Sequence, residues 1–384
     1  MKKLKGCIIG IFLAVLVIGV YNFYIIDKMD DAILENKETV RNTRTYERFW
    51  SHDVNKDIMD DNTLMIFGSS ELMSLEDYKV NVSSFLNNDS INVQTIGAGY
   101  FQSLNHAICL GSLGDELKGK KVALFLSPQW FAEQGVTTED FPSRYGEEHL
   151  LYFLSNDKID KKTKMYVLNR LDSLLISSPM QHNRLLRYKQ WIEEGDKLDG
   201  AYAQFMKKIW TFKDKQLVYK SIEDYKVDLP KISEDELDFD KILRIAEKQG
   251  EKACTNNEFG IDDEYWDTYV KETYENGPVK DKQEIYTESP EYEDLKLFLN
   301  LSKDLGVEVM LVNIPINKLW GEYVGQECNK YYSNIREISK KYDNVTLIDM
   351  SKYEKEKYFF RDIMHIGWKG WARINEELYT EFKK

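Results

Sequence analysis

The stretch "LMIFGSSEL" (residues 64–72) is an apolar run that stops at Gly68 and continues into two adjacent serines, Ser69 and Ser70. Four consecutive apolar side chains before a glycine are typical of a buried strand that ends in a tight connection. Two interpretations of Ser70 are open at this point. It either caps a following helix, as serine commonly does, or it stands at the strand end as a nucleophile.

Similar short apolar runs recur along the chain and indicate the fold class. Strands are predicted at residues 63–67, 91–96 and 122–127, which begin about 30 residues apart, the length of a strand–helix–strand unit. Two more strands are predicted at residues 307–315 and 344–350. Segments with helical periodicity separate them, and an amphipathic one closes the chain. The alternation predicts an α/β protein with a doubly wound, five-stranded parallel sheet.

A long segment interrupts this alternation and suggests a division into domains. Residues 131–290 show helical periodicity and mixed charge without a clear strand, so we expect a mainly helical insertion. The sheet-forming domain then consists of residues 61–130 and 291–384. Residues 27–60 are charged and lack glycine and proline, and we expect them to form a helical stalk.

The first 26 residues are expected to form a cytoplasmic tip and a transmembrane anchor. Lys2, Lys3 and Lys5 precede an uncharged apolar run at residues 6–26, which as a helix spans about 30 Å, enough to cross a bilayer. A cleaved signal peptide is the alternative, but the end of the run, "VYNFYIID", lacks a small-x-small cleavage site. The lysines predict a single-pass protein of the cell membrane, with a cytoplasmic N-terminus and an extracellular folded domain.

Charge and cysteine spacing argue against several classes of function. A net charge of −13 disfavours nucleic acid as a partner, because phosphate binding needs clustered lysine and arginine. The four cysteines are scattered and form no CxxC pair, and the chain has neither HExxH nor a phosphate-binding glycine loop. We therefore expect no disulfide framework, no metal and no cofactor.

The segment after the last predicted strand, "FRDIMHIGW" (residues 360–368), contains the groups that bear on the role of the serine. Asp362 and His365 stand three residues apart. In serine-nucleophile catalysis a histidine takes the hydroxyl proton, and an aspartate orients and stabilises that histidine. Because the carboxyl ends of parallel strands share one edge of a sheet, Ser70 is predicted to meet His365 and Asp362 there.

Together these motifs resemble the SGNH (GDSL-like) esterase superfamily. "FGSSEL" stands where that superfamily has its Gly-Asp-Ser block, with Ser70 as the nucleophile and Ser69 in place of the aspartate. "DIMH" matches the block that carries the catalytic aspartate and histidine. The resemblance covers residues 62–130 and 291–384 and implies an SGNH-like core with esterase or acyl-transfer chemistry.

The same resemblance implies an oxyanion hole. Its donors would be the backbone N–H groups of Ser70 and of Gly99, with Gly97 as the second choice, both glycines lying in "GAGYFQS" (residues 97–103). In the third block, where the superfamily carries an asparagine, the sequence "LSPQW" offers Gln129.

Further polar residues near the predicted strand ends have two interpretations. Asn313 and Asn317 are candidates for binding the acceptor substrate, although turn chemistry around Pro315 explains them as well. His106 is expected to pack or to face solvent rather than to take part in catalysis. Three other histidines stand in polar or loop-like surroundings and are expected to be solvated: His52, His149 and His182.

Nearly the whole chain resembles a narrower family, the DltD proteins of Gram-positive bacteria. The anchor, "FGSSEL", "GAGYFQSLNH", "SPQWF", the helical insertion and "DIMHIGWKGW" carry this resemblance together. It implies D-alanylation of lipoteichoic acid at the outer membrane face, with a D-alanyl donor and a membrane-bound O-acyltransferase of the same pathway as partners. The leading hypothesis is a serine acyltransferase that works through an acyl-serine intermediate. A D-alanyl esterase or thioesterase, and a non-catalytic partner that positions the membrane acyltransferase, are the alternatives.

Overall fold

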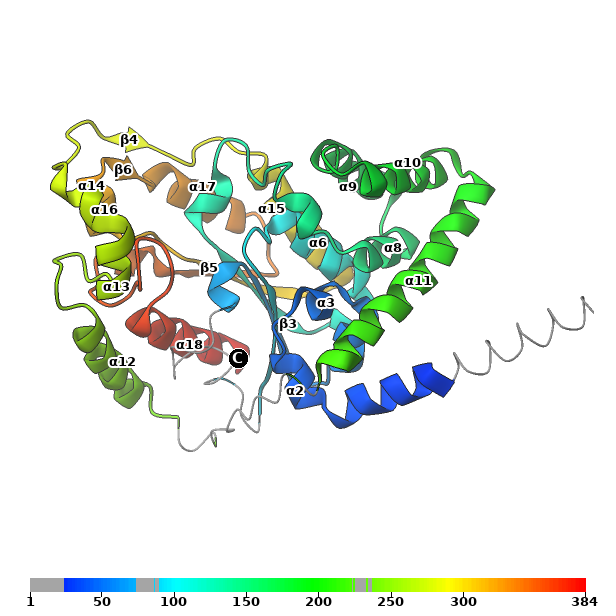
Figure 1. Cartoon of the computed structure of the whole chain (residues 1–384), viewed down its shortest axis with the longest axis horizontal. Coiled ribbons are helices and arrows are strands. Elements are labelled where there is room, and N and C mark those ends of the chain that lie inside the picture. The colour runs from blue at the N-terminus through cyan, green and yellow to red at the C-terminus, as the bar shows by residue number, and fades with distance from the viewer. Residues whose placement is uncertain (1–23, 74–85, 87–89, 223, 225–232, 234–236) are drawn as a thin grey trace, which may run out of the picture.

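The computed structural model describes residues 24–73, 86, 90–222, 224, 233 and 237–384, and its centre is a sheet of five parallel strands (Figure 1). In spatial order the strands are β2 (Asn92–Gly97), β1 (Thr63–Gly68), β3 (Lys121–Leu126), β5 (Glu308–Asn313) and β7 (Val345–Asp349). Every predicted strand overlaps an observed one. The predicted α/β fold with a five-stranded parallel sheet is therefore confirmed.

Helices cover both faces of the sheet, because successive side chains of a buried strand point to opposite faces. On one face Phe67 of β1 packs edge-to-face against Phe298, with 5.6 Å between the ring centroids. On the other face Ile66 belongs to a separate apolar cluster that includes Trp371. The covering helices are α6 (Ser103–Ser112), α7 (Gly114–Leu117), α15 (Glu291–Leu305) and α17 (Asn329–Ser339) on the first face and α18 (Trp368–Phe382) on the second.

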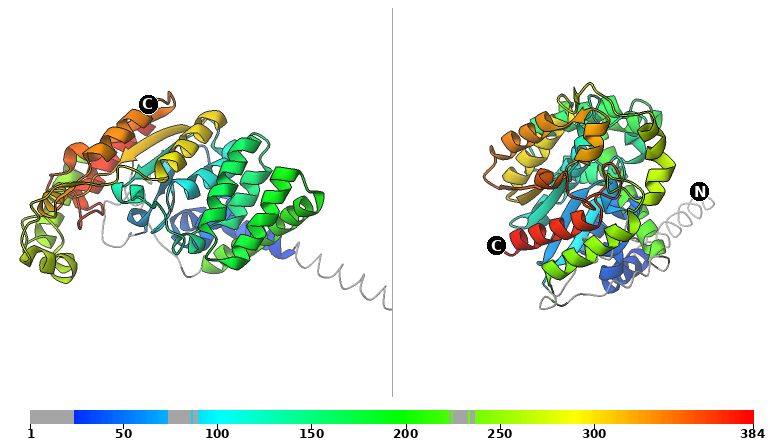
Figure 2. Two further views of the ribbon diagram at one scale, coloured as in Figure 1. Left: turned by 90° about the horizontal axis from the view of Figure 1, so that it is seen from above. Right: turned by 90° about the vertical axis from the view of Figure 1, so that its left-hand side faces the viewer.

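The insertion is mainly helical, as expected, and its two parts lie at opposite ends of the molecule (Figures 1 and 2). The first part consists of α8 (Glu147–Ser155), α9 (Lys161–Leu174), α10 (Pro179–Glu194) and α11 (Lys197–Ser221). The second consists of α12 (Phe239–Ala253), which packs on α18, α13 (Asp263–Tyr265), a π-helical turn (Trp266–Val270) and α14 (Lys271–Glu275). Aspartates at the N-caps start α9, α11 and α12 by accepting backbone N–H groups: Asp160, Asp196 and Asp238.

Short elements complete the fold and connect the larger ones. They are α16 (Lys318–Tyr323), the paired strands β4 (Gln283–Glu284) and β6 (Gln326–Glu327), and the 3-10 turns η1 (Ser70–Leu72), η2 (Pro128–Phe131), η3 (Phe141–Ser143) and η6 (Met350–Tyr353). Three of the turns, η1, η2 and η6, follow strands of the main sheet within one residue, at the edge where a ligand is expected.

The segment expected to form a stalk, residues 27–60, is largely helical, and its second half packs into the folded body. Its helices include α2 (Lys37–Asn42), α3 (Tyr46–Trp50) and α4 (His52–Asp57). Arg48 is buried and donates hydrogen bonds to Oδ1 of Asn55, 3.0 Å away, and to the carbonyl oxygen of Thr95 in β2. These contacts tie the segment to the edge of the sheet.

The expected anchor at residues 6–26 lies almost entirely outside the described residues, which begin at Tyr24. Among the helices of the described ranges, none is both long enough and apolar enough to cross a bilayer. The anchor therefore stays a prediction from the sequence.

Candidate active site

The carboxyl edge of the sheet brings together the three side chains singled out in the sequence. Ser70 opens η1 directly after β1, and its Oγ lies 2.9 Å from Nε2 of His365. Nδ1 of His365 donates a hydrogen bond to Oδ2 of Asp362, 2.7 Å away. With the proton on Nδ1, the free Nε2 can accept the hydroxyl proton of Ser70. Three residues from the two ends of the domain thus form one hydrogen-bonded relay.

The surroundings of Asp362 favour its ionised form. The carboxylate is buried, and its Oδ1 accepts the backbone N–H groups of Met364 and His365, both at 2.8 Å. Burial by itself would raise the pKa of Asp362, but the hydrogen bonds and the charge of His365 outweigh burial and lower this pKa. Burial would lower the pKa of His365, yet the hydrogen bond with Asp362 and its negative charge raise it.

The hydroxyl groups of the two adjacent serines have different roles. Ser69 occupies the N-cap position of η1, and its hydroxyl donates to the carbonyl oxygen of Ala98 at 3.1 Å instead of capping the turn. Ser70 lies inside the turn with its hydroxyl at His365. The interpretation of Ser70 as a helix cap is therefore wrong.

Gly68 lies in a crowded turn. A Cβ atom at Gly68 would lie 2.5 Å from Oε1 of Glu71 and 2.7 Å from a side-chain carbon of Leu72. Glu71 is buried and folds back so that Oε1 accepts the N–H of Ser69 at 2.7 Å, while burial raises the pKa of the carboxyl. Glu71 was not among the predicted site residues, although a carboxylate directly after the nucleophile is a visible signal in the sequence.

The candidate oxyanion donors come from the strands on either side of β1. Gly97 of β2 pairs with Gly68 of β1, and β3 pairs with the other side of β1. Gly99 follows β2, and open space lies where its Cβ would be. Gln129 lies in η2 after β3, and its buried Oε1 has no hydrogen-bond partner among the described residues. Both therefore flank the turn that carries Ser70, and their role as donors stays a prediction.

Arg144, at the end of η3 in the insertion, holds the loop that contains Gly99. Its Nε donates to the carbonyl oxygen of Gly99 at 2.7 Å. Its guanidinium lies over the rings of Tyr46 and Tyr100, 4.6 and 5.7 Å from their centroids. Tyr100 has a φ of 70°, an unusual value for an aromatic residue. No local pattern in the sequence marks Arg144, because its contact is with a loop 45 residues earlier.

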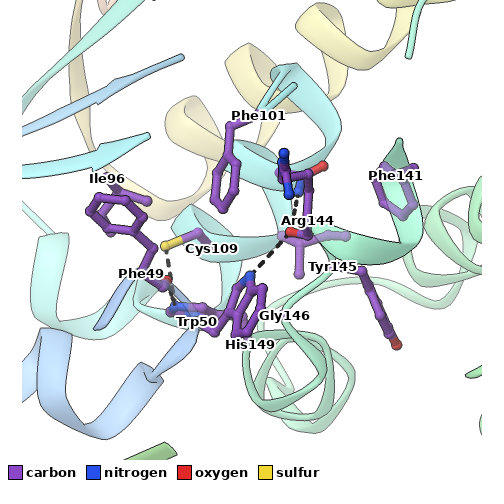
Figure 3. A pocket seen from close by; sticks show the side chains of 12 residues that line it. Phe49, Trp50, Ile96, Phe101, Cys109, Phe141, Arg144, Tyr145, Gly146 and His149 are labelled. Atoms are coloured by element: carbon purple, nitrogen blue, oxygen red, sulfur yellow. Dashed lines mark hydrogen bonds between the residues drawn. The ribbon is translucent and has the colours of Figure 1, made fainter. Parts of the chain in front are cut away.

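A small cavity of about 20 Å³ lies beside this loop (Figure 3). Arg144 lines it together with Phe49, Phe101, Phe141 and His149. None of the three relay residues contributes to its wall, and its volume admits about one water molecule. The cavity is therefore too small to hold a substrate, and the relay does not line it.

His106 is buried beneath the turn, in agreement with the expectation that it packs. Its Nε2 donates to the carbonyl oxygen of Gly68 at 2.9 Å, and its ring centroid lies 5.3 Å from that of Phe67 and 5.9 Å from that of Trp130. Burial lowers the pKa of His106 to about 3, so the imidazole is neutral. His106 supports the end of β1.

The expectation that His52 and His149 are solvated is wrong. Both are buried, and their Nδ1 atoms lie 3.3 and 2.7 Å from Oγ of Ser112. Burial lowers the pKa of both, that of His149 to about 4. The reason is that α8 of the insertion packs on α4 and α6, which a polar local context cannot reveal. His182 remains partly exposed and contacts Asp172 at 2.6 Å.

Asn313 and Asn317 are both buried. Asn317 caps α16, because its Oδ1 accepts the N–H of Trp320 at 3.2 Å, and its Nδ2 donates to the carbonyl oxygen of Phe259 at 2.9 Å. The Nδ2 of Asn313 donates to Oδ1 of Asp349 at 3.0 Å. Local structure thus accounts for Asn317, as the alternative interpretation of this residue proposed.

The sequence is similar to a known protein family over most of its length. A family model described as "DltD protein" matches residues 42–383. Protein DltD of Bacillus subtilis (strain 168) is 28% identical over 362 residues, which cover 92% of this chain and 90% of that protein. Protein DltD of Staphylococcus aureus (strain NCTC 8325 / PS 47) is 28% identical over 325 residues (83% and 80%), and that of Lacticaseibacillus rhamnosus is 26% identical over 341 residues (84% and 78%). The chain therefore belongs to the DltD family.

Proposed function

We propose that this protein is a membrane-anchored, extracellular serine acyltransferase that transfers D-alanyl groups onto lipoteichoic acid. DltD proteins are involved in D-alanylation of teichoic acids. The observation that carries the proposed mechanism is the 2.9 Å contact between Ser70 and His365, which continues to Asp362. The proposal includes the anchor at residues 6–26 and, as a partner, a membrane-bound O-acyltransferase of the same pathway.

The first half of the reaction forms an acyl-serine. Oγ of Ser70 attacks the carbonyl carbon of a D-alanyl ester or thioester, while Nε2 of His365 accepts the hydroxyl proton. The N–H groups of Ser70 and Gly99 and the amide of Gln129 stabilise the charge on the carbonyl oxygen, and losing one such donor typically costs about 3–4 kcal/mol. The bond to the donor then breaks, His365 protonates the leaving group, and D-alanyl-Ser70 remains.

The second half transfers the acyl group to the acceptor. A glycerol hydroxyl of the teichoic acid chain attacks the D-alanyl carbonyl carbon, and His365 takes the proton of that hydroxyl and returns it to Ser70. Asp362 stays ionised in both halves and stabilises the imidazolium each time it forms. Because water can use the same route, transfer requires that water be kept from the acyl-serine.

Two adjacent serines provide a matched test of the nucleophile. The purified full chain is incubated with a synthetic D-alanyl thioester, and the peptide that contains both serines is examined by mass spectrometry. The unmodified protein and Ser69→Ala are expected to gain one D-alanyl group, whereas Ser70→Ala gains none. In cells, D-alanylation that persists at its normal level with Ser70→Ala would contradict catalysis and favour the non-catalytic partner.

The acceptor is tested on the trapped acyl-serine. A glycerol-phosphate oligomer is expected to discharge D-alanyl-Ser70 faster than buffer alone and to become esterified. Discharge by water at the same rate, with no esterified oligomer, would favour the D-alanyl esterase.

A further inference from the structure

The outer face of α11 is apolar along its whole length. This helix has 25 residues and lies on the outside of the molecule, in green on the right of Figure 1. Leu198 is 79% exposed, Phe205 61%, and Ile209 and Tyr219 are each 40% exposed. At 3.6 residues per turn these four side chains fall on one side of the helix, opposite the residues that pack into the protein. They form an exposed apolar stripe. In a soluble protein, the exposed face of a helix usually carries charged residues of both signs.

The charged residues of the same face are all basic. Four lysines of α11 are exposed: Lys197, Lys208, Lys213 and Lys220. The whole of α11 is described, and its two carboxylates, Asp199 and Asp214, are both buried. Asp199 is moreover bonded to Nε of Arg187 at 2.6 Å. Within α11 itself, lysines and large apolar side chains therefore alternate on the outer face without an exposed acid, although the chain has a net charge of −13 and the N-cap Asp196 is exposed.

This combination is typical of a helix that lies in a membrane interface. Such helices place phenylalanine and leucine at the level of the upper acyl chains and lysines at the phosphates, and anionic lipids attract them. A partner protein with an acidic surface would meet the lysines but would not by itself explain a stripe of protruding apolar side chains.

The position of α11 in the chain supports contact with the membrane. Residues 24–35 form a helix, and Ile33 packs with Val218 of α11 and with Ile222, the residue directly after α11. Asp30 is bonded to Nζ of Lys215 at 2.6 Å. The apolar run expected to cross the membrane leads directly into residues 24–35. Figures 1 and 2 show this helix, in dark blue, beside α11.

We propose that the exposed face of α11 rests on the anionic outer surface of the membrane, as a second attachment besides the anchor. Leu198, Phe205 and Ile209 enter the interface, and the exposed lysines bind lipid phosphates. This contact restricts the orientation of the catalytic edge relative to the membrane. The inference goes beyond the proposed chemistry and rests only on the proposed anchoring.

The test uses the full chain in vesicles with a fluorophore on one introduced cysteine. Cys7→Ser removes the cysteine outside the described residues, and the three other native cysteines are buried. The fluorophore is placed at Phe205→Cys on α11 or, as a control, at Tyr269→Cys, which is 70% exposed. Tyr269 belongs to the π-helical turn between α13 and α14, and these two helices lie at the opposite end of the molecule (Figure 1). Vesicles consist of phosphatidylcholine with or without phosphatidylglycerol. In vesicles that contain phosphatidylglycerol, we expect brominated lipid to quench the label at residue 205 and iodide in solution not to quench it. The label at residue 269 should stay accessible to iodide.

Lysine variants separate this contact from anchoring. Lys208→Gln, Lys213→Gln and Lys220→Gln together should abolish the protection at 205, since each lysine near an anionic surface contributes roughly a fivefold factor in binding. As a control, replacing Lys330, Lys340 and Lys341, which are exposed at α17, with glutamine should leave the protection of the label at 205 unchanged. The proposal is overturned if the chain floats with the vesicles but the label at 205 stays as accessible as the label at 269. It is equally overturned if protection appears only with a co-reconstituted membrane O-acyltransferase, because a protein then covers this face. A chain that does not float contradicts the anchor as well.

Discussion

Gly97 of β2 lies so close to Gly68 of β1 that a Cβ atom on Gly97 would stand 2.3 Å from the carbonyl oxygen of Gly68. The same carbonyl oxygen accepts a hydrogen bond from Nε2 of His106 at 2.9 Å. The peptide group between Gly68 and Ser69 is therefore held from two sides. On one side the backbone of β2 approaches closely because residue 97 is a glycine, and on the other side the buried imidazole of His106 donates a hydrogen bond. The position of the Ser70 hydroxyl depends on this support.

Gly97→Ala should destabilise the protein and displace Ser70, whereas Gly99→Ala should not affect folding. The first substitution forces a methyl group into backbone atoms, and overpacking of this kind costs about 1–3 kcal/mol. The second meets no atom within 4 Å and keeps the N–H of residue 99. Urea unfolding of both variants, with acyl-serine formation as the second readout, checks this. Equal stability of the two variants would contradict the role given to the contact between the glycines.

Acyl-serine formation should fall at low pH with a midpoint above 6.5, the ordinary pKa of histidine. Only neutral His365 can accept the proton of Ser70, and Asp362 raises the pKa of His365, so protonation sets in at a higher pH than usual. In Asp362→Asn this influence is lost, and the midpoint should move to lower pH while the rate drops by roughly 10,000-fold. A pH–rate profile of the single acylation step measures both. An unchanged midpoint in the variant would show that another group controls the low-pH limb.

Arg144→Ala should slow acyl-serine formation by about tenfold without a matching loss of stability, because a small displacement of a catalytic group is costly in rate. Arg144 fixes the carbonyl oxygen of Gly99 and is itself partly exposed. Arg187→Ala is the control, since Arg187 binds Asp199 and Tyr202 within the insertion. Arg144→Lys should restore part of the rate, because lysine keeps one donor. If both alanine variants acylate at the normal rate, Arg144 does not position the loop.

The protein should lose stability as the pH falls from 6.5 towards 4, partly because of His149. Its pKa is about 4 in the folded protein and near 6.5 in the unfolded chain, so the unfolded chain binds more protons in this window. The resulting loss in the free energy of unfolding is on the order of 3 kcal/mol once the pH is below both pKa values. It is absent above pH 6.5, where His149 is neutral in both the folded and the unfolded protein. His149→Gln should flatten the pH dependence of the unfolding free energy over this range. A parent protein equally stable at pH 4.5 and pH 7 would contradict the neutral, buried state of His149.

Most of the fold was predictable because its signals are local. Each strand is a contiguous apolar run, and the helices between them are marked by periodicity and by glycine such as Gly306, which ends α15 in the left-handed region. The meeting of Ser70 with His365 was predictable for the same reason, since parallel strands place their carboxyl ends at one edge. Arg144 and the buried His149 were not predictable, because each is defined by a contact with another element. Glu71 contacts Ser69 within the same turn, so the sequence did carry a signal for it.

The sequence by itself determined the order of strands and helices, the family, and which serine, histidine and aspartate are candidates for chemistry. Apolar periodicity and short motifs encode these properties within a few residues. Only the tertiary structure decided that Gly68 makes room for a buried carboxylate, that Arg144 of the insertion holds the loop with Gly99, and that α11 buries both of its acids while four of its lysines are exposed. These depend on how distant segments pack, and the burial of a polar group follows from its neighbours in space rather than from its neighbours along the chain.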